Sequence, residues 1–221
     1  MRLAVVFTKE APVRFVSHLD LQRLFQRAFR RAKLPLAYSQ GFNPHPLLAF
    51  AAALSVGMTS CGEYLDVTLT EDMTPEAFTD AVSPELPEGV RIVEAFDISY
   101  SRKSLTSAMR SARYSAKAVF DRDVVESEIG EAIGSMLSSE IVVMKRTKGG
   151  IKPVDIRPMV LSLELVRSAE RSADFLIEGV LSAEGGLNPE TLLNVLFERL
   201  CVNGMTDINR LETVLDRDAL L

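Results

Sequence analysis

The chain has few of the residues that hold metals or form disulfide frameworks. Its 221 residues include only two cysteines and two histidines. Cys61 and Cys201 lie far apart in the sequence, and neither belongs to a zinc or iron–sulfur ligand pattern. We therefore expect no metal and no other cofactor in this chain.

Long hydrophobic runs are also missing. The longest spans residues 47–53, well short of the roughly 20 residues that a membrane helix needs. No secretory or lipidation signal is apparent at the N-terminus. Together with a hydrophobic fraction of 47% and a charged fraction of 25%, these absences predict a cytoplasmic globular protein without a membrane contact.

Complete catalytic motifs are absent as well. The sequence contains no phosphate-binding loop, no G-x-G-x-x-G and no G-x-S-x-G. Ser17, His18 and Asp20 are neighbours only in sequence, and their side chains diverge at a helix start, so they do not indicate a triad. Whether the chain is an enzyme stays open.

Acidic residues are scarce in the first part of the chain. Residues 1–62 hold eight Lys or Arg against two acids, a balance of +6, whereas the remainder holds 17 basic and 28 acidic residues, a balance of −11. This asymmetry favours an anion-binding face at the N-terminal end, with a solvated surface of uneven charge as the alternative.

The order of strand and helix signals predicts an α+β fold of two ferredoxin-like (β-α-β-β-α-β) halves in tandem, residues 1–100 and 113–221. Residues 99–112 are polar and basic and are the predicted linker. In the first half we expect strands within 2–14, 47–56, 63–69 and 90–98, and helices over 17–33 and 74–84. In the second we expect strands at 114–120, 141–144, 159–166, 175–181 and 208–215, and helices over 123–137 and 188–201.

The first predicted helix has two different sides. Its apolar stripe comprises Leu21, Phe25, Ala28, Phe29 and Ala32, and it faces the core. The other side carries Arg23, Arg27 and Arg30, with Arg31 beside them. The sequence contains no acid between Asp20 and Glu63, so Arg23, Arg27 and Arg30 are expected to be unpaired. All four arginines are expected to bind phosphate through their planar forks. A merely solubilising helix face is the alternative.

The loop that follows, YSQGFNPHP, is stiffened by two prolines. Tyr38 and Phe42 are candidates for stacking on bases, and His45 for binding a phosphate or transferring a proton. His18, His45 and Tyr38 are the candidate catalytic residues. The alternative is a structural turn with Phe42 in the core.

A second basic segment lies at residues 145–158. It contains the candidate nucleic-acid ligands Lys145, Arg146, Lys148 and Lys152, and a Gly-Gly pair that indicates a hairpin turn. A basic hairpin can follow a phosphate backbone. A mobile solvated hairpin is the alternative.

The segments RFVSHLDLQRLFQRAFRRAKLPLAYSQGFNPHP, LSVGMTSCGEYLDVTL and KGGIKPVDIRPMV resemble the radical-SAM-associated family of bacterial proteins. That family is a domain of unknown function, found fused to or encoded beside a radical-SAM protein. The resemblance implies a role in tRNA or rRNA modification or maturation. It also implies that an iron–sulfur cluster and S-adenosylmethionine belong to a radical-SAM partner.

Three hypotheses follow for the function. The first is an RNA-binding accessory protein that works with a radical-SAM partner. The second is a metal-independent RNA-processing enzyme, resembling the twin-ferredoxin endoribonucleases of CRISPR systems, in which a histidine is the general acid–base. The third is a protein–protein adaptor for the radical-SAM partner. The first is the preferred hypothesis, since it gives a role to the basic residues of the first helix and of residues 145–158.

Overall fold

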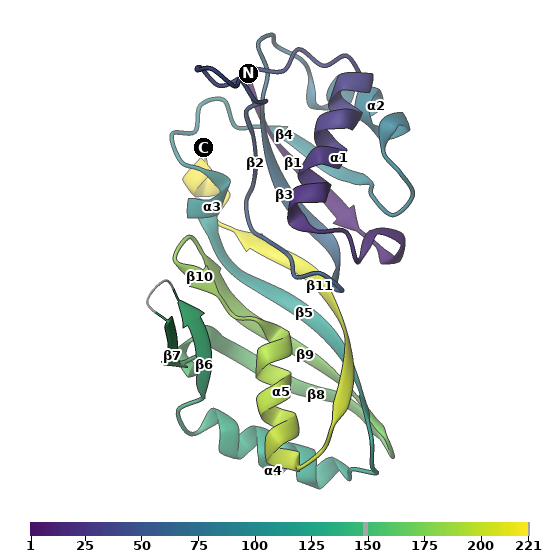
Figure 1. Ribbon diagram of the computed structural model, residues 1–221, viewed down its shortest axis with the longest axis vertical. Coiled ribbons are helices and arrows are strands. Elements are labelled where there is room, and N and C mark those ends of the chain that lie inside the picture. The colour runs from purple at the N-terminus through teal and green to yellow at the C-terminus, as the bar shows by residue number, and fades with distance from the viewer. Residues whose placement is uncertain (148–149, 221) are drawn as a thin grey trace. The chain divides into compact units, whose positions relative to one another are not determined.

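The computed structural model describes residues 1–147 and 150–220. It consists of two compact units (Figure 1): unit 1 comprises residues 1–110 and 210–221, and unit 2 comprises residues 111–209. This division differs from the predicted halves, 1–100 and 113–221, because the last twelve residues belong to unit 1. The α+β class is confirmed, whereas the tandem ferredoxin-like halves remain a prediction.

Unit 1 is built around three antiparallel strands in the order β4-β1-β3, with the short β2 and the end of β11 beside β3. Its elements are β1 (Arg2–Lys9), α1 (His18–Arg31), β2 (Leu48–Phe50), β3 (Thr59–Thr68), α2 (Pro75–Val82), β4 (Ile92–Asp97) and α3 (Leu105–Ala108). The predicted helix starts are confirmed. The Ser17 hydroxyl accepts from the backbone N–H of Asp20, and that of Thr74 from Ala77.

Aromatic packing fixes the position of α1. The rings of Phe7 on β1 and Phe25 lie 4.7 Å apart, and those of Phe29 and Phe78 on α2 lie 5.6 Å apart. Phe25 and Phe29 are fully buried, so the predicted apolar stripe of α1 is confirmed. The opposite side of the helix must therefore face solvent.

Several segments differ from the sequence expectation. The strand expected within 47–56 is only Leu48–Phe50, and the helices expected over 17–33 and 123–137 are shorter than predicted. After β1 the chain forms a single 3-10 turn, η1 (Ala11–Val13), instead of a second strand, since Pro12 occupies its second position. The expected linker contains α3, whose Leu105 and Ala108 are buried. The apolar residues within that polar segment anchor it to unit 1.

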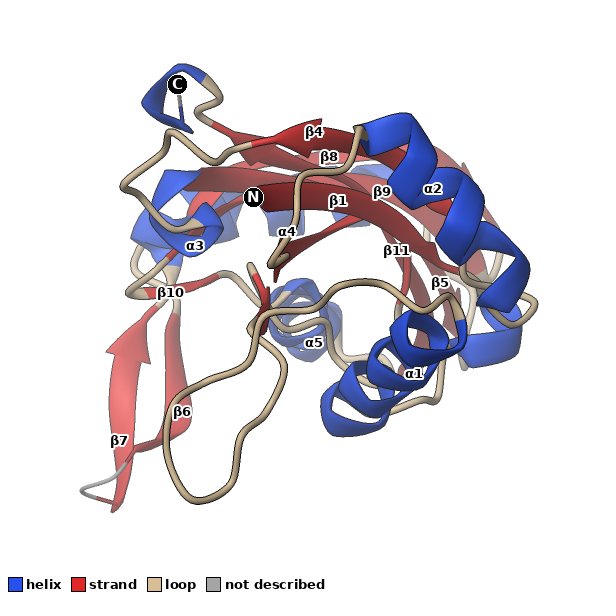
Figure 2. Ribbon diagram, turned by 90° about the horizontal axis from the view of Figure 1, so that it is seen from above, coloured by secondary structure: helices blue, strands red, loops and turns tan. Residues whose placement is uncertain are grey.

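Unit 2 contains the antiparallel strands β8-β9-β5, with β10 beside β9 and the start of β11 beside β5. Its elements are most of β5 (Met109–Phe120), α4 (Glu126–Leu137), β6 (Val142–Thr147), β7 (Gly150–Asp155), β8 (Val160–Ala169), β9 (Ser172–Ser182), β10 (Gly185–Gly186), α5 (Pro189–Leu200) and the start of β11 (Gly204–Leu215). Strands β6 and β7 form the predicted basic hairpin as a separate two-stranded sheet (Figure 2). Among the described residues, no helix is long and apolar enough to cross a membrane.

Candidate nucleic-acid interface

The arginines of α1 fall into two groups. Arg27 and Arg30 are exposed, and neither forms an ion pair with any residue in the described ranges 1–147 and 150–220. Arg23 instead pairs with Asp20, one turn earlier, at 2.9 Å. Arg31 pairs with Glu85 at 2.6 Å. The expectation that Arg23, Arg27 and Arg30 are unpaired is therefore wrong for Arg23.

The ion pairs of Arg23 and Arg31 form for different physical reasons. Asp20 lies three residues before Arg23, on the same side of the helix. The Ser17 hydroxyl donates to the same carboxylate at 2.8 Å. This hydrogen bond, followed by the hydrogen bond from Arg23 and by the positive charges of Arg23 and Arg27, lowers the pKa of Asp20. The partner of Arg31 comes from 54 residues further along the chain, a distance at which sequence spacing gives no information.

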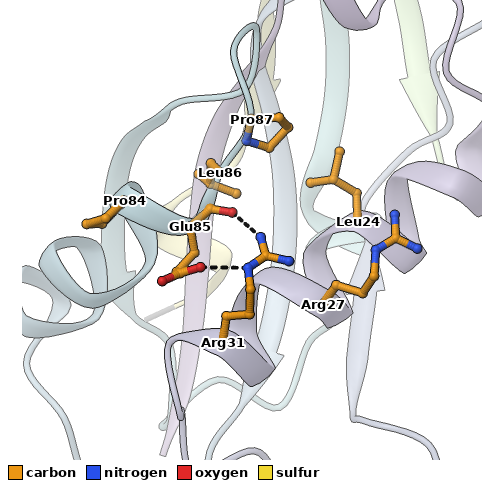
Figure 3. Close-up of a pocket in the computed structure, with 7 residues that line it drawn as sticks. All are labelled: Leu24, Arg27, Arg31, Pro84, Glu85, Leu86 and Pro87. Carbon is orange, nitrogen blue, oxygen red and sulfur yellow. Dashed lines mark hydrogen bonds and ion pairs between the residues drawn. The ribbon is translucent and has the colours of Figure 1, made fainter.

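A groove of about 490 Å³ lies between α1 and the segment that follows α2 (Figure 3). It is lined by Leu24, Arg27, Arg31, Pro84, Glu85, Leu86 and Pro87. The guanidinium of Arg31 is fixed to both the carboxylate and the carbonyl of Glu85. Among the described residues that line the groove, Arg27 is the one cation that forms no ion pair, and it is therefore the candidate ligand for an anion there.

The loop from Tyr38 to Pro46 is braced internally. The backbone N–H of Ser39 donates to the carbonyl of His45 at 2.9 Å, and the N–H of His45 donates to the Ser39 hydroxyl at 3.1 Å. The same hydroxyl lies 2.9 Å from His45 Nδ1. Tyr38 and Pro46 form an isolated antiparallel bridge at the base. The loop is therefore ordered by its own backbone and by one serine.

Phe42 lies at the tip of this loop, and its side chain is fully exposed. The alternative in which Phe42 packs into the core is therefore wrong. Tyr38 is 41% exposed, and His45 is exposed as well. None of the three lines the groove beside Arg27, so this groove is not one that the loop and the arginines share.

The remaining candidates are exposed but lie in different surroundings. The ring of His18 lies 5.0 Å from that of Phe50 in an edge-to-face contact, which gives this histidine a packing role. On the hairpin, Lys145 faces Lys152 in register, with Arg146 next to it. Lys148 lies outside the described residues.

Sequence reasoning missed a buried cluster of charges in unit 1. Arg210 on β11 donates to both carboxylate oxygens of Glu63 on β3, each at 2.9 Å, and both side chains are about 95% buried. Lys9, at the end of β1, is also buried and donates to the carbonyl of Arg14 at 3.0 Å. Burial lowers the pKa of Lys9, and the nearby carboxylate of Glu63 opposes that shift.

A signal for this cluster exists in the patterns of the two strands. Every residue of β1 from Leu3 to Lys9 is buried, and in the alternating β3 Glu63 begins the inward series that continues with Leu65 and Val67. A charged residue in phase with a buried apolar face predicts a buried charge that needs a partner. Within the described residues, no group of three or more His, Cys, Asp or Glu side chains could hold a metal ion.

Residues 2–189 match the family described as "Uncharacterized protein conserved in bacteria (DUF2344)", and the chain belongs to that family. Among curated protein sequences, none matches this chain. The function therefore has to be inferred from the family and from the geometry of the surface.

The chain is similar in fold to chains of three solved complexes. These are an H/ACA RNP bound to a substrate RNA containing 2′-deoxyuridine (TM-score 0.53, 11% identity), a Cbf5-Nop10-Gar1 complex (0.55, 12%) and an archaeal box H/ACA sRNP Nop10-Cbf5 complex (0.52, 10%). Each alignment covers 96% of this chain and 47%, 48% and 47% of the other chain, respectively. The chain thus spans about half the length of the solved chains that it matches.

Proposed function

We propose that this protein is an RNA-binding accessory protein in tRNA or rRNA modification or maturation. In this proposal residues 1–100 and 113–221 are ferredoxin-like halves, and the arginine side of α1 binds the phosphate backbone. The iron–sulfur cluster and S-adenosylmethionine belong to a radical-SAM partner, as the resemblance of the long N-terminal segment implies.

The observation that carries the proposal is the pair Arg27 and Arg30. The two guanidinium groups lie on one exposed side of a helix whose other side is fixed by Phe25 and Phe29. A guanidinium presents a planar fork that binds phosphate bidentately, and a rigid helix sets the spacing of two such forks. Like charges at this spacing repel each other unless an anion lies between them.

Two further observations support an RNA as the anion. The hairpin adds the exposed cations Lys145, Arg146 and Lys152, of which Lys145 and Lys152 face each other without a neutralising acid between them. Two of the solved complexes with a similar fold are an H/ACA RNP and an H/ACA sRNP, and one of these holds a substrate RNA.

The proposal is tested by measuring the affinity for a transcribed bacterial tRNA as a function of salt concentration. Single charge reversals at Arg27 and Arg30 are compared with Lys117→Glu, an exposed reversal on β5 that changes the net charge equally. We expect log K of the natural sequence to fall linearly with log salt. Each α1 variant should flatten that slope by about 0.7–0.9 for each phosphate that it no longer binds, while Lys117→Glu should leave it unchanged.

The remaining hypotheses give other outcomes of the same assay. Cleavage of the RNA without added metal, abolished in His45→Ala, would identify a ribonuclease. Binding without salt dependence, or an equal effect of Lys117→Glu and Arg27→Glu, would contradict the proposal. Absence of RNA binding together with binding to a purified radical-SAM protein would identify an adaptor.

A further inference from the structure

The Tyr38–Pro46 loop holds an exposed aromatic ring on an ordered support. We propose that this loop is the base-binding part of the RNA interface, with Phe42 stacking on an unpaired nucleobase. The inference rests on the proposed function and names the class of RNA, which is single-stranded or looped rather than fully paired.

The first argument concerns order. The loop is closed by the Tyr38–Pro46 bridge and by the three contacts between Ser39 and His45 at 2.9 to 3.1 Å. Its base is tied to β3, because the carbonyl of Thr68 accepts from Ala37 N–H at 2.9 Å. Because the base of the loop is closed on both sides of Phe42, the backbone has less conformational entropy to lose when a ligand stacks on the ring.

The second argument concerns the direction of the ring. Gly41 adopts a φ of +131°, a backbone conformation that other residues rarely adopt, and no atom lies within 4 Å of where its Cβ would be. The chain therefore turns at the tip without closing over it. Phe42, the next residue, is directed into solvent, although burying such a ring gains about 1.5–3 kcal/mol.

The third argument concerns chemistry. Residues 34–62 contain no Asp, Glu, Lys or Arg, so this loop does not attract phosphate by side-chain charge. It offers a ring for stacking and, on either side of it, the exposed amides of Gln40 and Asn43. Aromatic rings stack on bases of any kind, and side-chain amides bind base edges. These groups complement the arginines of α1, which bind backbone.

The fourth argument distinguishes RNA from a protein partner. Protein interfaces surround a buried aromatic anchor with contacts that exclude water. The neighbours of Phe42 are Gln40, Gly41, Asn43 and Pro44, all exposed and mostly polar or small. A base needs only the face of the ring and hydrogen bonds at its edge. In a duplex the faces of the bases are already stacked, which leaves unpaired nucleotides as the ligand.

The experiment compares a single-stranded RNA oligonucleotide of mixed sequence with the same sequence as a duplex. One central adenine is replaced by 2-aminopurine, whose fluorescence falls when it stacks. We expect Phe42→Ala to weaken single-strand binding roughly 5- to 150-fold, corresponding to one stacked base, and to abolish the quenching. Phe42→Trp should retain both, and duplex affinity should stay constant.

Two control variants sharpen the result. Tyr100→Ala removes an aromatic ring that is 90% exposed elsewhere in unit 1, and it should change neither quantity. Ser39→Ala removes the hydroxyl that braces His45. Because Ser39 is a positioning residue, this variant should weaken single-strand binding less than Phe42→Ala and leave the slope of log K against log salt unchanged.

The outcomes separate this inference from the proposed function. If Phe42→Ala leaves single-strand affinity and quenching unchanged while Arg27→Glu weakens binding, the base-binding loop is wrong and RNA binding stands. Equal weakening for single strand and duplex would also overturn base stacking. If no RNA binds the natural sequence with salt-dependent affinity, the proposed function itself fails.

Discussion

Unit 1 contains two sets of charges in opposite surroundings. On α1, Arg27 and Arg30 face solvent above an aromatic core. Inside the unit, Arg210 and Glu63 are about 95% buried and doubly hydrogen-bonded. The guanidinium groups on α1 are thus available to bind a ligand, whereas that of Arg210 is bound by a carboxylate. Burial and partner, rather than residue type, decide which role an arginine has.

The same distinction holds within α1 itself. The side chains of Arg23 and Arg31 are 65% and 52% exposed, yet each already has a carboxylate partner. Exposed ion pairs contribute little to stability, about 0–1 kcal/mol, so a phosphate could displace either partner. Arg27 and Arg30 have no carboxylate partner among the described residues that a phosphate would have to displace.

The largest expected effect is on the buried pair. Glu63→Ala leaves the guanidinium of Arg210 buried without its carboxylate, and we expect it to lower the free energy of unfolding by about 3–5 kcal/mol. The measurement is urea-induced unfolding with an unchanged m-value. In the double variant Glu63→Leu, Arg210→Met, much of that loss should be regained because no uncompensated guanidinium remains, while the Lys9 ammonium keeps its hydrogen bond to the Arg14 carbonyl. A loss below about 1 kcal/mol in the single variant would mean that the pair is not buried in solution.

The next prediction contrasts the two sides of α1. Phe25→Ala should cost about 3–5 kcal/mol because it opens a cavity in a fully buried aromatic cluster. Arg27→Ala should stay within about 0.5 kcal/mol, since its side chain is exposed. Both values come from the same unfolding measurement. A large loss in Arg27→Ala would make that arginine structural and remove it from the proposed interface.

A smaller effect is expected from releasing Arg23. Asp20→Asn removes the carboxylate at 2.9 Å, so Arg23 becomes available to phosphate, and the slope of log K against log salt should steepen by up to about 0.9. Asp80→Asn, an exposed change on α2, alters the net charge equally and serves as the control. If both variants have the same effect, net charge alone explains the gain, and the arginine side of α1 has no special part in it.

The smallest effect concerns pH. Burial lowers the pKa of Lys9 in the folded state, whereas in the unfolded chain it is about 10.4. The unfolded state therefore binds more protons between these two values, and the contribution of Lys9 to stability rises with pH in that interval. The difference in unfolding free energy between the natural sequence and Lys9→Met should grow from neutral pH toward pH 10. A constant difference would show that Lys9 keeps its ordinary pKa.

Much of unit 1 could be predicted from local patterns. Ser17 and Thr74 start their helices as expected, because a side-chain oxygen at a helix start satisfies a backbone N–H that has no helical partner. The buried and exposed sides of α1 follow from its period of 3.6 residues. The exposure of Phe42 could not be predicted, since a ring in a loop packs or protrudes according to contacts made elsewhere.

The amino-acid sequence by itself determined the α+β class, the start of α1 and the side on which its arginines lie, because these depend on neighbours within a few residues. Only the tertiary structure decided which arginines have a carboxylate partner and that the residues from Arg210 onward belong to unit 1. Glu85 reaches Arg31 from 54 residues away and Arg210 reaches Glu63 from 147. Such pairs form because burial makes an unpartnered charge costly, and the partner is whichever residue the folded chain places beside it.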